Sequence, residues 1–217
     1  MDGFFQYTRA ERAVDAGIHA AGIIAALVGI VVLAVQMPWP PQGRVVAALA
    51  VYAIGLLSML LASAAYNGVR DGRAKGVLRR VDRAAIFVMI AGTYTPMTVM
   101  GLGGGGTGFG LLAVVWAGAI AGAVLSLTGG EWFDRFAIAS YLALGWCGFL
   151  LIGQLWEVLS PAAFTLLLAG GACYSLGVIA HQASRMRFHN ALWHAMVMAG
   201  AGCHFALVLL LARAAHG

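Results

Sequence analysis

Seven runs of predominantly apolar residues, each about 18 residues or longer, follow one another along the chain with short polar breaks between them. A run of that length crosses the hydrocarbon core of a bilayer as a helix. We therefore predict an all-α membrane protein built as a bundle of seven transmembrane helices. The predicted spans are 14–36, 44–67, 84–101, 109–128, 135–156, 161–182 and 190–213.

The composition leaves little room for structure outside the membrane. Of the 217 residues, 62% are hydrophobic and 10% are charged, and the mean hydropathy is +0.89. A water-soluble fold of this composition would expose very large apolar surfaces. We predict a single transmembrane domain over residues 1–217, in which residues 1–13 form a short interfacial segment. The first apolar run is too long for a cleaved signal sequence and is expected to remain in the mature protein.

The basic residues predict the orientation of the bundle. All 13 Lys and Arg residues except Arg44 and Arg213 fall on one side of the predicted membrane. The positive-inside rule assigns that side to the cytoplasm, so we expect a multi-pass protein of a bacterial-type cytoplasmic membrane, with its amino terminus inside and its carboxyl terminus outside.

Nucleic acid is not an expected partner, because the basic loop after the second span lacks interleaved aromatic residues. The expected partners are membrane lipids, whose anionic head groups would contact Arg70, Arg73, Lys75, Arg79 and Arg80.

Polar residues at helical spacing interrupt the ends of the second and seventh spans. Ser63 and Asn67 are four positions apart, as are Asn190 and His194, and residues four apart stack on one helix face. Under the predicted topology both pairs lie at the same depth as Asp82. Because ionisable residues in a membrane are costly and usually face the protein interior or a water-filled cavity, the set predicts a buried polar chamber.

Two plainer interpretations of these residues stay open. Asp82 can be an interfacial residue at a helix N-terminus, where the helix dipole favours a carboxylate. His194 can be a core histidine that is hydrogen-bonded to Ser63 or to a backbone carbonyl.

Four motifs on the second, third, fifth and seventh spans resemble the hemolysin III proteins, which belong with the progestin and adiponectin receptor superfamily. The resemblance implies seven helices and a cytoplasmic amino terminus. It also implies a zinc site, because in the eukaryotic relatives, which are similar to alkaline ceramidases, three histidines of a Ser-xxx-His and a His-xxx-His motif bind zinc beside an aspartate. The motifs are Ser63-Ala-Ala-Tyr-Asn67, Asp82-Arg-Ala-Ala-Ile-Phe-Val-Met-Ile-Ala-Gly-Thr-Tyr-Thr-Pro96, Tyr141-Leu-Ala-Leu-Gly-Trp146 and Asn190-Ala-Leu-Trp-His194.

This chain departs from the zinc-binding pattern at two positions. The serine, the aspartate and the last histidine correspond to Ser63, Asp82 and His194, but the other two histidine positions are occupied by Asn67 and Asn190. Neutral amides are weak zinc ligands, and one imidazole with one carboxylate is too few for a catalytic zinc site. We therefore expect a hydrogen-bonded polar site that holds no cofactor. The alternative is a site that holds zinc, in which His194 would be the one ligand.

Several functions remain open at this point. The first is sensing or homeostasis of membrane lipids, as the resemblance implies. An alternative is a membrane-embedded, metal-dependent hydrolase of a ceramide-like lipid amide, with Ser63, Asp82 and His194 as the catalytic residues. A further alternative, suggested by the family name, is hemolytic or cytolytic activity, although a seven-span bundle cannot easily leave one membrane for another. Whether the protein is an enzyme stays undecided.

Overall fold

The computed structural model describes residues 7–37, 39–40, 42–69, 72–103 and 105–215. Within these residues, seven helical segments are long and apolar enough to cross a membrane. The predicted all-α, seven-span fold is thereby confirmed. The elements are α1 (Arg9–Val35), α2 (Gly43–Gly68), α3 (Arg73–Pro96), the π-helical η1 (Met97–Gly101), α4 (Gly106–Thr128), α5 (Gly130–Asp134), α6 (Ala137–Gly145), the 3-10 helix η2 (Cys147–Leu151), α7 (Ile152–Val158), α8 (Pro161–Gln182) and α9 (His189–Ala214).

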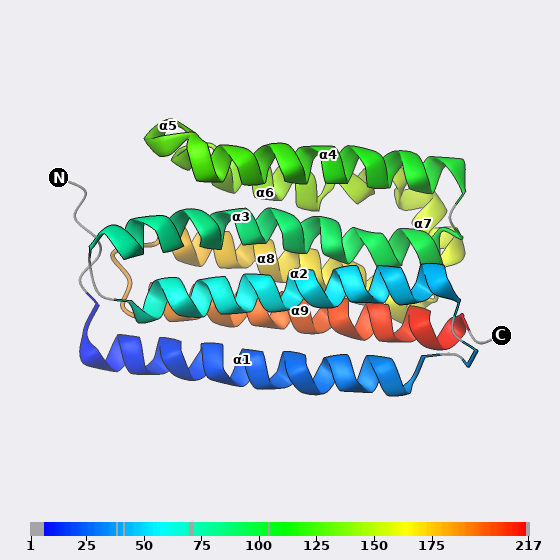
Figure 1. Ribbon diagram of the computed structural model, residues 1–217, viewed down its shortest axis with the longest axis horizontal. Coiled ribbons are helices and arrows are strands. Elements are labelled where there is room, and N and C mark those ends of the chain that lie inside the picture. Colours follow the sequence, from blue (N-terminus) through cyan, green and yellow to red (C-terminus); the bar gives the residue numbers. More distant parts are fainter. Residues whose placement is uncertain (1–6, 38, 41, 70–71, 104, 216–217) are drawn as a thin grey trace.

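The long helices run side by side, and α1 begins at the opposite end of the bundle from the end of α9 (Figure 1). Helix α3 packs against both α2 and α4, while α9 packs against α8 and α1. As a result, the start of α1, the end of α2, the start of α3 and the start of α9 all lie at one end of the bundle (Figure 1). This end carries the polar residues that the sequence analysis identified.

Helix α1 begins with a reciprocal cap. The Thr8 hydroxyl accepts a hydrogen bond from the Glu11 backbone N–H at 3.2 Å, and the Glu11 carboxylate accepts one from the Thr8 N–H at 2.8 Å. Residues 9–13, which we predicted to lie in an interfacial segment, form the first turns of α1. Tyr7 and Thr8 precede the helix, and residues 1–6 of that segment lie outside the described residues.

The third span starts earlier than predicted. We expected a helix from residue 84, but α3 begins at Arg73, because polar contacts extend the helix beyond its apolar part. Arg79 Nη2 donates to Asp134 Oδ2 at 2.7 Å, and Arg83 also pairs with the Asp134 carboxylate. Asp82 is therefore an interior residue of α3 and does not lie at the helix N-terminus, the plainer interpretation that stayed open from the sequence.

The fifth span is interrupted where a single helix over 135–156 was expected. Helix α6 ends at Gly145, and the chain passes through η2 into α7. Glycine weakens a helix, and here a side chain replaces the lost backbone bonds. The Tyr94 hydroxyl donates to the Gly145 carbonyl and accepts from the Gly148 N–H, both at 2.7 Å. Tyr94 therefore stabilises the interruption from α3.

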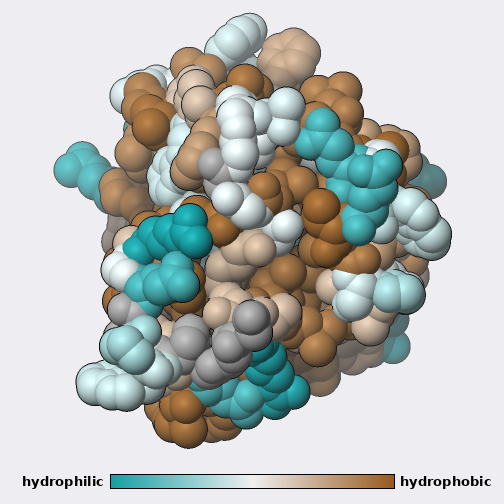
Figure 2. All heavy atoms as spheres, turned by 90° about the vertical axis from the view of Figure 1, so that its right-hand side faces the viewer, coloured by the Kyte–Doolittle hydropathy of each residue, from teal (hydrophilic) through white to brown (hydrophobic). Residues whose placement is uncertain are grey.

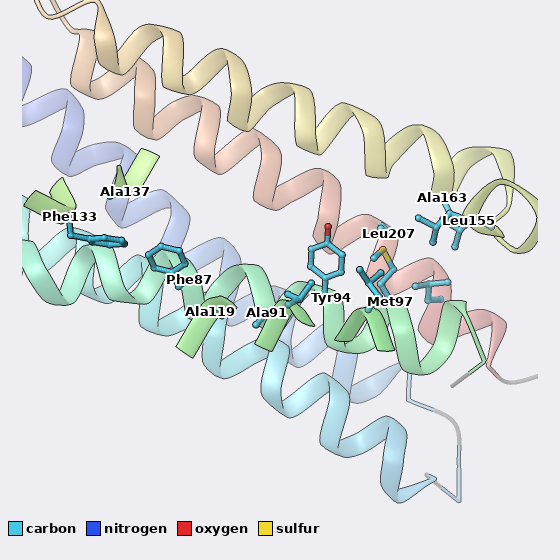
Figure 3. Packing of buried hydrophobic residues seen from close by; sticks show 14 residues of the cluster. Phe87, Ala91, Tyr94, Met97, Ala119, Phe133, Ala137, Leu155, Ala163 and Leu207 are labelled. Carbon is cyan, nitrogen blue, oxygen red and sulfur yellow. The ribbon is translucent and has the colours of Figure 1, made fainter. Parts of the chain in front are cut away.

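Two apolar clusters fill the bundle. One lies between α3, α4, α6, α7 and α9 and includes Phe87, Tyr94 and Leu207 (Figure 3). The other lies between α1, α2, α3 and α9 and includes Tyr52, which is fully buried. Many large apolar side chains face outward, as lipid contact requires. Viewed from the end of the bundle where α9 finishes, hydrophilic side chains form separate patches among the apolar ones (Figure 2).

Candidate functional site

The two polar pairs predicted from the sequence meet in the structure. Asn67 Nδ2 donates to the Ser63 carbonyl at 2.9 Å, one turn back along α2. Asn190 Nδ2, on α9, donates to Asn67 Oδ1 at 3.3 Å. The two asparagines therefore bond to each other and join the second span to the seventh, as expected of a hydrogen-bonded site.

Helix α1 contributes two residues that the sequence analysis did not assign to the site, Asp15 and His19. His194 Nδ1 lies 2.5 Å from Asp15 Oδ1, and Asn190 Nδ2 donates to the same oxygen at 3.3 Å. Asp15, His19 and His194 are 7%, 6% and 8% exposed. A buried carboxylate is stable only when it is paired. The two hydrogen-bond partners of the Asp15 carboxylate, Asn190 and His194, come from α9, and His19 Nδ1 on α1 lies 3.6 Å from Asp15 Oδ2.

His19 connects the α1 pair to α2. Its Nδ1 lies 2.8 Å from the Asp15 backbone carbonyl, and its Nε2 lies 3.1 Å from the Ser63 hydroxyl. A carbonyl oxygen only accepts, so Nδ1 carries the proton and donates. In the neutral ring Nε2 then accepts from Ser63. The His19 and His194 rings meet edge to face, with their centroids 4.4 Å apart.

A cavity of about 140 Å³ begins at this cluster and extends into the bundle. Ser63, Asp82, His19 and His194 line it at one end, so the structure brings Asp82 to the same chamber as Ser63 and His194. This placement favours the chamber over the interfacial interpretation of Asp82. Most of the remaining wall is apolar, and the wall also includes Tyr94, Trp146, Tyr174 and His204. The chamber therefore combines a hydrogen-bonding end with an apolar interior.

The polar end of the cavity is covered by the start of α1. Glu11 Oε1 accepts from the Phe188 backbone N–H at 3.0 Å, beside the start of α9. The Tyr7 ring packs against His189 with a centroid separation of 5.7 Å. Burial is the main cause that raises the pKa of Tyr7 to about 12, so this phenol stays protonated at neutral pH. These contacts hold α1 against α9 just outside the Asp15 and His194 pair.

Comparison with known proteins agrees with the resemblance found in the sequence. A family model described as Haemolysin-III related matches residues 7–205. The chain belongs to the hemolysin III family. It is 30% identical over 203 residues to "Hemolysin-3 homolog" of Bacillus subtilis (strain 168), a match that covers 94% of this chain and 95% of the relative. It is also 30% identical over 209 residues to "Hemolysin-3" of Bacillus cereus, covering 96% of this chain and 94% of the relative.

The site of this hemolysin III chain contains more potential metal ligands than we predicted from the sequence. The prediction included one imidazole, His194, and one carboxylate, Asp82. The structure adds His19 and Asp15, and Asp15, His19 and His194 each offer a ligand atom within 4.8 Å of the other two. Two imidazoles and one carboxylate form a donor set that zinc takes in hydrolases. The residues present therefore fit a zinc-class ion, through ligands different from those that the resemblance implied.

A signal for the missing pair was present in the sequence. Asp15 and His19 are four positions apart, the same spacing by which the pairs on α2 and α9 were recognised. Asp15 was not grouped with the other polar residues, because it stands at the predicted start of the first span, 14–36. The neighbouring helices that pair with it could not be located from the sequence.

Proposed function

We propose that this hemolysin III-type protein holds a single-chain lipid in its interior cavity and takes part in sensing or adjusting the lipid composition of its membrane. The observation that supports this most directly is the composition of the cavity wall, with the Ser63, Asp82 and His194 side chains at one end and apolar side chains along most of the rest. A lipid presents the same two chemistries in one molecule. Preformed apolar pockets with a few placed polar groups are typical ligand sites.

The size of the cavity limits what enters. About 140 Å³ is close to the volume of an engineered cavity that takes a benzene ring. A segment of one acyl chain fits this space, and the rest of a long-chain lipid would extend beyond it. We therefore expect a fatty acid or an N-acyl amide, with its carbonyl or carboxyl group near Ser63. With the amino terminus in the cytoplasm, the polar end lies on the cytoplasmic side.

Binding of a radiolabelled long-chain fatty acid to the detergent-purified protein tests this function. Saturable binding of one molecule per chain is expected. Replacing Ser63 by Ala removes a polar group from the lined end and should weaken binding by about five- to tenfold, as expected for one hydrogen bond of about 1 kcal/mol. The matched control is Ser140→Ala, because among the described residues the Ser140 hydroxyl bonds only to the Phe136 carbonyl, one turn earlier, and does not line the cavity. Non-saturable binding, or equal weakening by both variants, would contradict the proposal.

Hydrolysis of a lipid amide or ester is a second candidate function, favoured by the Asp15, His19 and His194 donor set. A zinc ion bound there would supply a water whose pKa is lowered to about 7. Among the chain's own groups, Asp82 is the carboxylate beside the chamber that would take up and return a proton. The Ser63 hydroxyl would hold the substrate carbonyl. Release of fatty acid from an N-acyl amide, abolished in Asp82→Asn, is the expected sign of this activity, and its absence from the zinc-loaded protein would argue against it.

We further propose that the start of α3 contacts anionic head groups, mainly through Arg73 and Arg80. These two side chains are exposed, although Arg80 also donates to the Leu127 carbonyl at 3.4 Å. Lys75 and Arg79 are less exposed: Lys75 donates to the Val69 carbonyl at 3.2 Å, and Arg79 bonds to Asp134. Arg70 lies outside the described residues. The double variant Arg73→Ala, Arg80→Ala should co-purify with less anionic phospholipid than the native protein, and an unchanged amount would refute this contact.

A further inference from the structure

We propose that Asp15, His19 and His194 bind one zinc-class divalent cation, so that α1 supplies two of the three protein ligands. The cation would lie in the same chamber as the proposed lipid, but the inference does not depend on a lipid being bound. It assigns the metal to residues other than Asn67 and Asn190, the positions that the family resemblance implied.

The three donor atoms are close enough to share one ion. They lie within 4.8 Å of one another, and all three side chains are buried. Zinc bonds to imidazole nitrogen and carboxylate oxygen at about 2.0–2.2 Å, which places neighbouring donors roughly 3–4 Å apart. Small side-chain rotations therefore bring the cluster to binding distances. With three protein ligands, the fourth position of a tetrahedral ion is left for water or substrate.

The hydrogen bonds of the His19 ring leave one nitrogen as an acceptor that a metal ion would take over from Ser63. Its Nδ1–H donates to the Asp15 backbone carbonyl at 2.8 Å, which leaves the Nε2 lone pair directed at the Ser63 hydroxyl, 3.1 Å away. Metal-binding histidines almost always donate their second ring N–H to a carbonyl or carboxylate in this manner. Because the carbonyl belongs to the preceding turn of α1, the helix itself fixes the tautomer.

Asn67 and Asn190 are not proposed as ligands, but they form hydrogen bonds around the proposed site. Asn190 Nδ2 donates to Asp15 Oδ1 and to Asn67 Oδ1, both at 3.3 Å. Asn67 in turn donates to the Ser63 carbonyl. These bonds orient the Asp15 carboxylate and use the asparagines as structural links between helices. The change from histidine to asparagine on α2 and α9 is thus accompanied in this chain by a carboxylate and an imidazole on α1.

Zinc titration of the chelator-treated, detergent-purified protein tests the proposal, with bound zinc counted by inductively coupled plasma mass spectrometry. We expect one zinc per native chain. His19→Gln and Asp15→Asn should each weaken zinc binding by more than about tenfold, since even loss of a supporting residue outside the ligands costs 10–100-fold. The matched control is His204→Gln, which removes a histidine from the same cavity and should leave the stoichiometry unchanged. A native protein that binds no zinc, or equal loss in all three variants, would overturn the proposal.

A second variant separates ligation from folding. In His19→Cys loaded with Co²⁺, a thiolate ligand gives a near-ultraviolet charge-transfer band that the native protein lacks. We expect this band together with one bound Co²⁺. Co²⁺ bound at native stoichiometry without the band would show that residue 19 is not a ligand and would overturn the proposal. Fatty-acid binding by the chelated native protein is measured in parallel, so that failure of the metal site and failure of the proposed lipid binding are distinguished.

Discussion

Asp15 Oδ1 lies 2.5 Å from His194 Nδ1, although 179 positions separate the two residues in the chain. This contact joins the first membrane span to the last and buries both side chains. The polar chamber therefore exists only when the bundle has closed. The same oxygen also accepts a hydrogen bond from Asn190. The Asp15 carboxylate therefore contacts two polar side chains that α9 contributes to the site.

The Asp15 and His194 pair should show energetic coupling. In a double-mutant cycle with Asp15→Asn and His194→Gln, we expect a coupling of about 0.5–3 kcal/mol in the free energy of unfolding, because the two side chains are in direct contact and each single variant replaces one partner of that contact. Unfolding is followed in mixed micelles. The control cycle pairs Asp15→Asn with His204→Gln, roughly 15 Å further along α9, and should be additive. Additive effects in the first cycle would contradict the observed contact.

The hydroxyl of Tyr94 should matter more than that of Tyr52. Tyr94→Phe removes both bonds that hold the break between α6 and η2 and leaves the Gly148 N–H without its partner, which costs about 1–3 kcal/mol. The Tyr52 hydroxyl is buried and makes no hydrogen bond within the described part of the chain, so Tyr52→Phe should be neutral or slightly stabilising. Thermal unfolding of the two variants compares them, and a larger loss for Tyr52→Phe would refute the assignment.

The close approach of α4 to α3 should depend on Gly122. A Cβ at this position would lie 2.3 Å from the Phe87 ring, whereas one at Gly110 on the same helix meets nothing within 4 Å. Phe87 is buried and packed in the core, so Gly122→Ala should destabilise the protein by about 1–3 kcal/mol through overpacking. Gly110→Ala should be neutral or stabilising, because alanine favours a helix more than glycine does. Chemical unfolding of both variants decides between them.

The sequence predicted the spans well because long apolar runs admit few alternatives in a membrane. It could not place the ends that depend on tertiary contacts. The start of α3 at Arg73 is stabilised by ion pairs between its basic residues and Asp134, and the break after Gly145 is bridged by Tyr94 from another helix. Predicting either feature requires knowing which helices are neighbours in the bundle.

The candidate site was predictable on three of its four helices. Ser63, Asn67, Asp82, Asn190 and His194 were grouped from spacing and depth, and the structure brings them together. The contribution of α1 was missed, since spacing along one helix does not say which neighbour that helix faces. The expectation of a metal-free site rested on that incomplete set of donors.

Occupancy of the cavity by lipid is the most direct test of this account. Native mass spectrometry of the purified protein, with and without added fatty acid, counts bound single-chain lipid. Val178 lines the cavity, so Val178→Trp should fill it and abolish binding, whereas the outward-facing Ile179, 66% exposed, should tolerate Trp without effect. We predict one lipid per chain in the native protein and in Ile179→Trp, and none in Val178→Trp. Equal lipid in all three proteins, or none in the native protein, would contradict the central claim that the chamber is a lipid site.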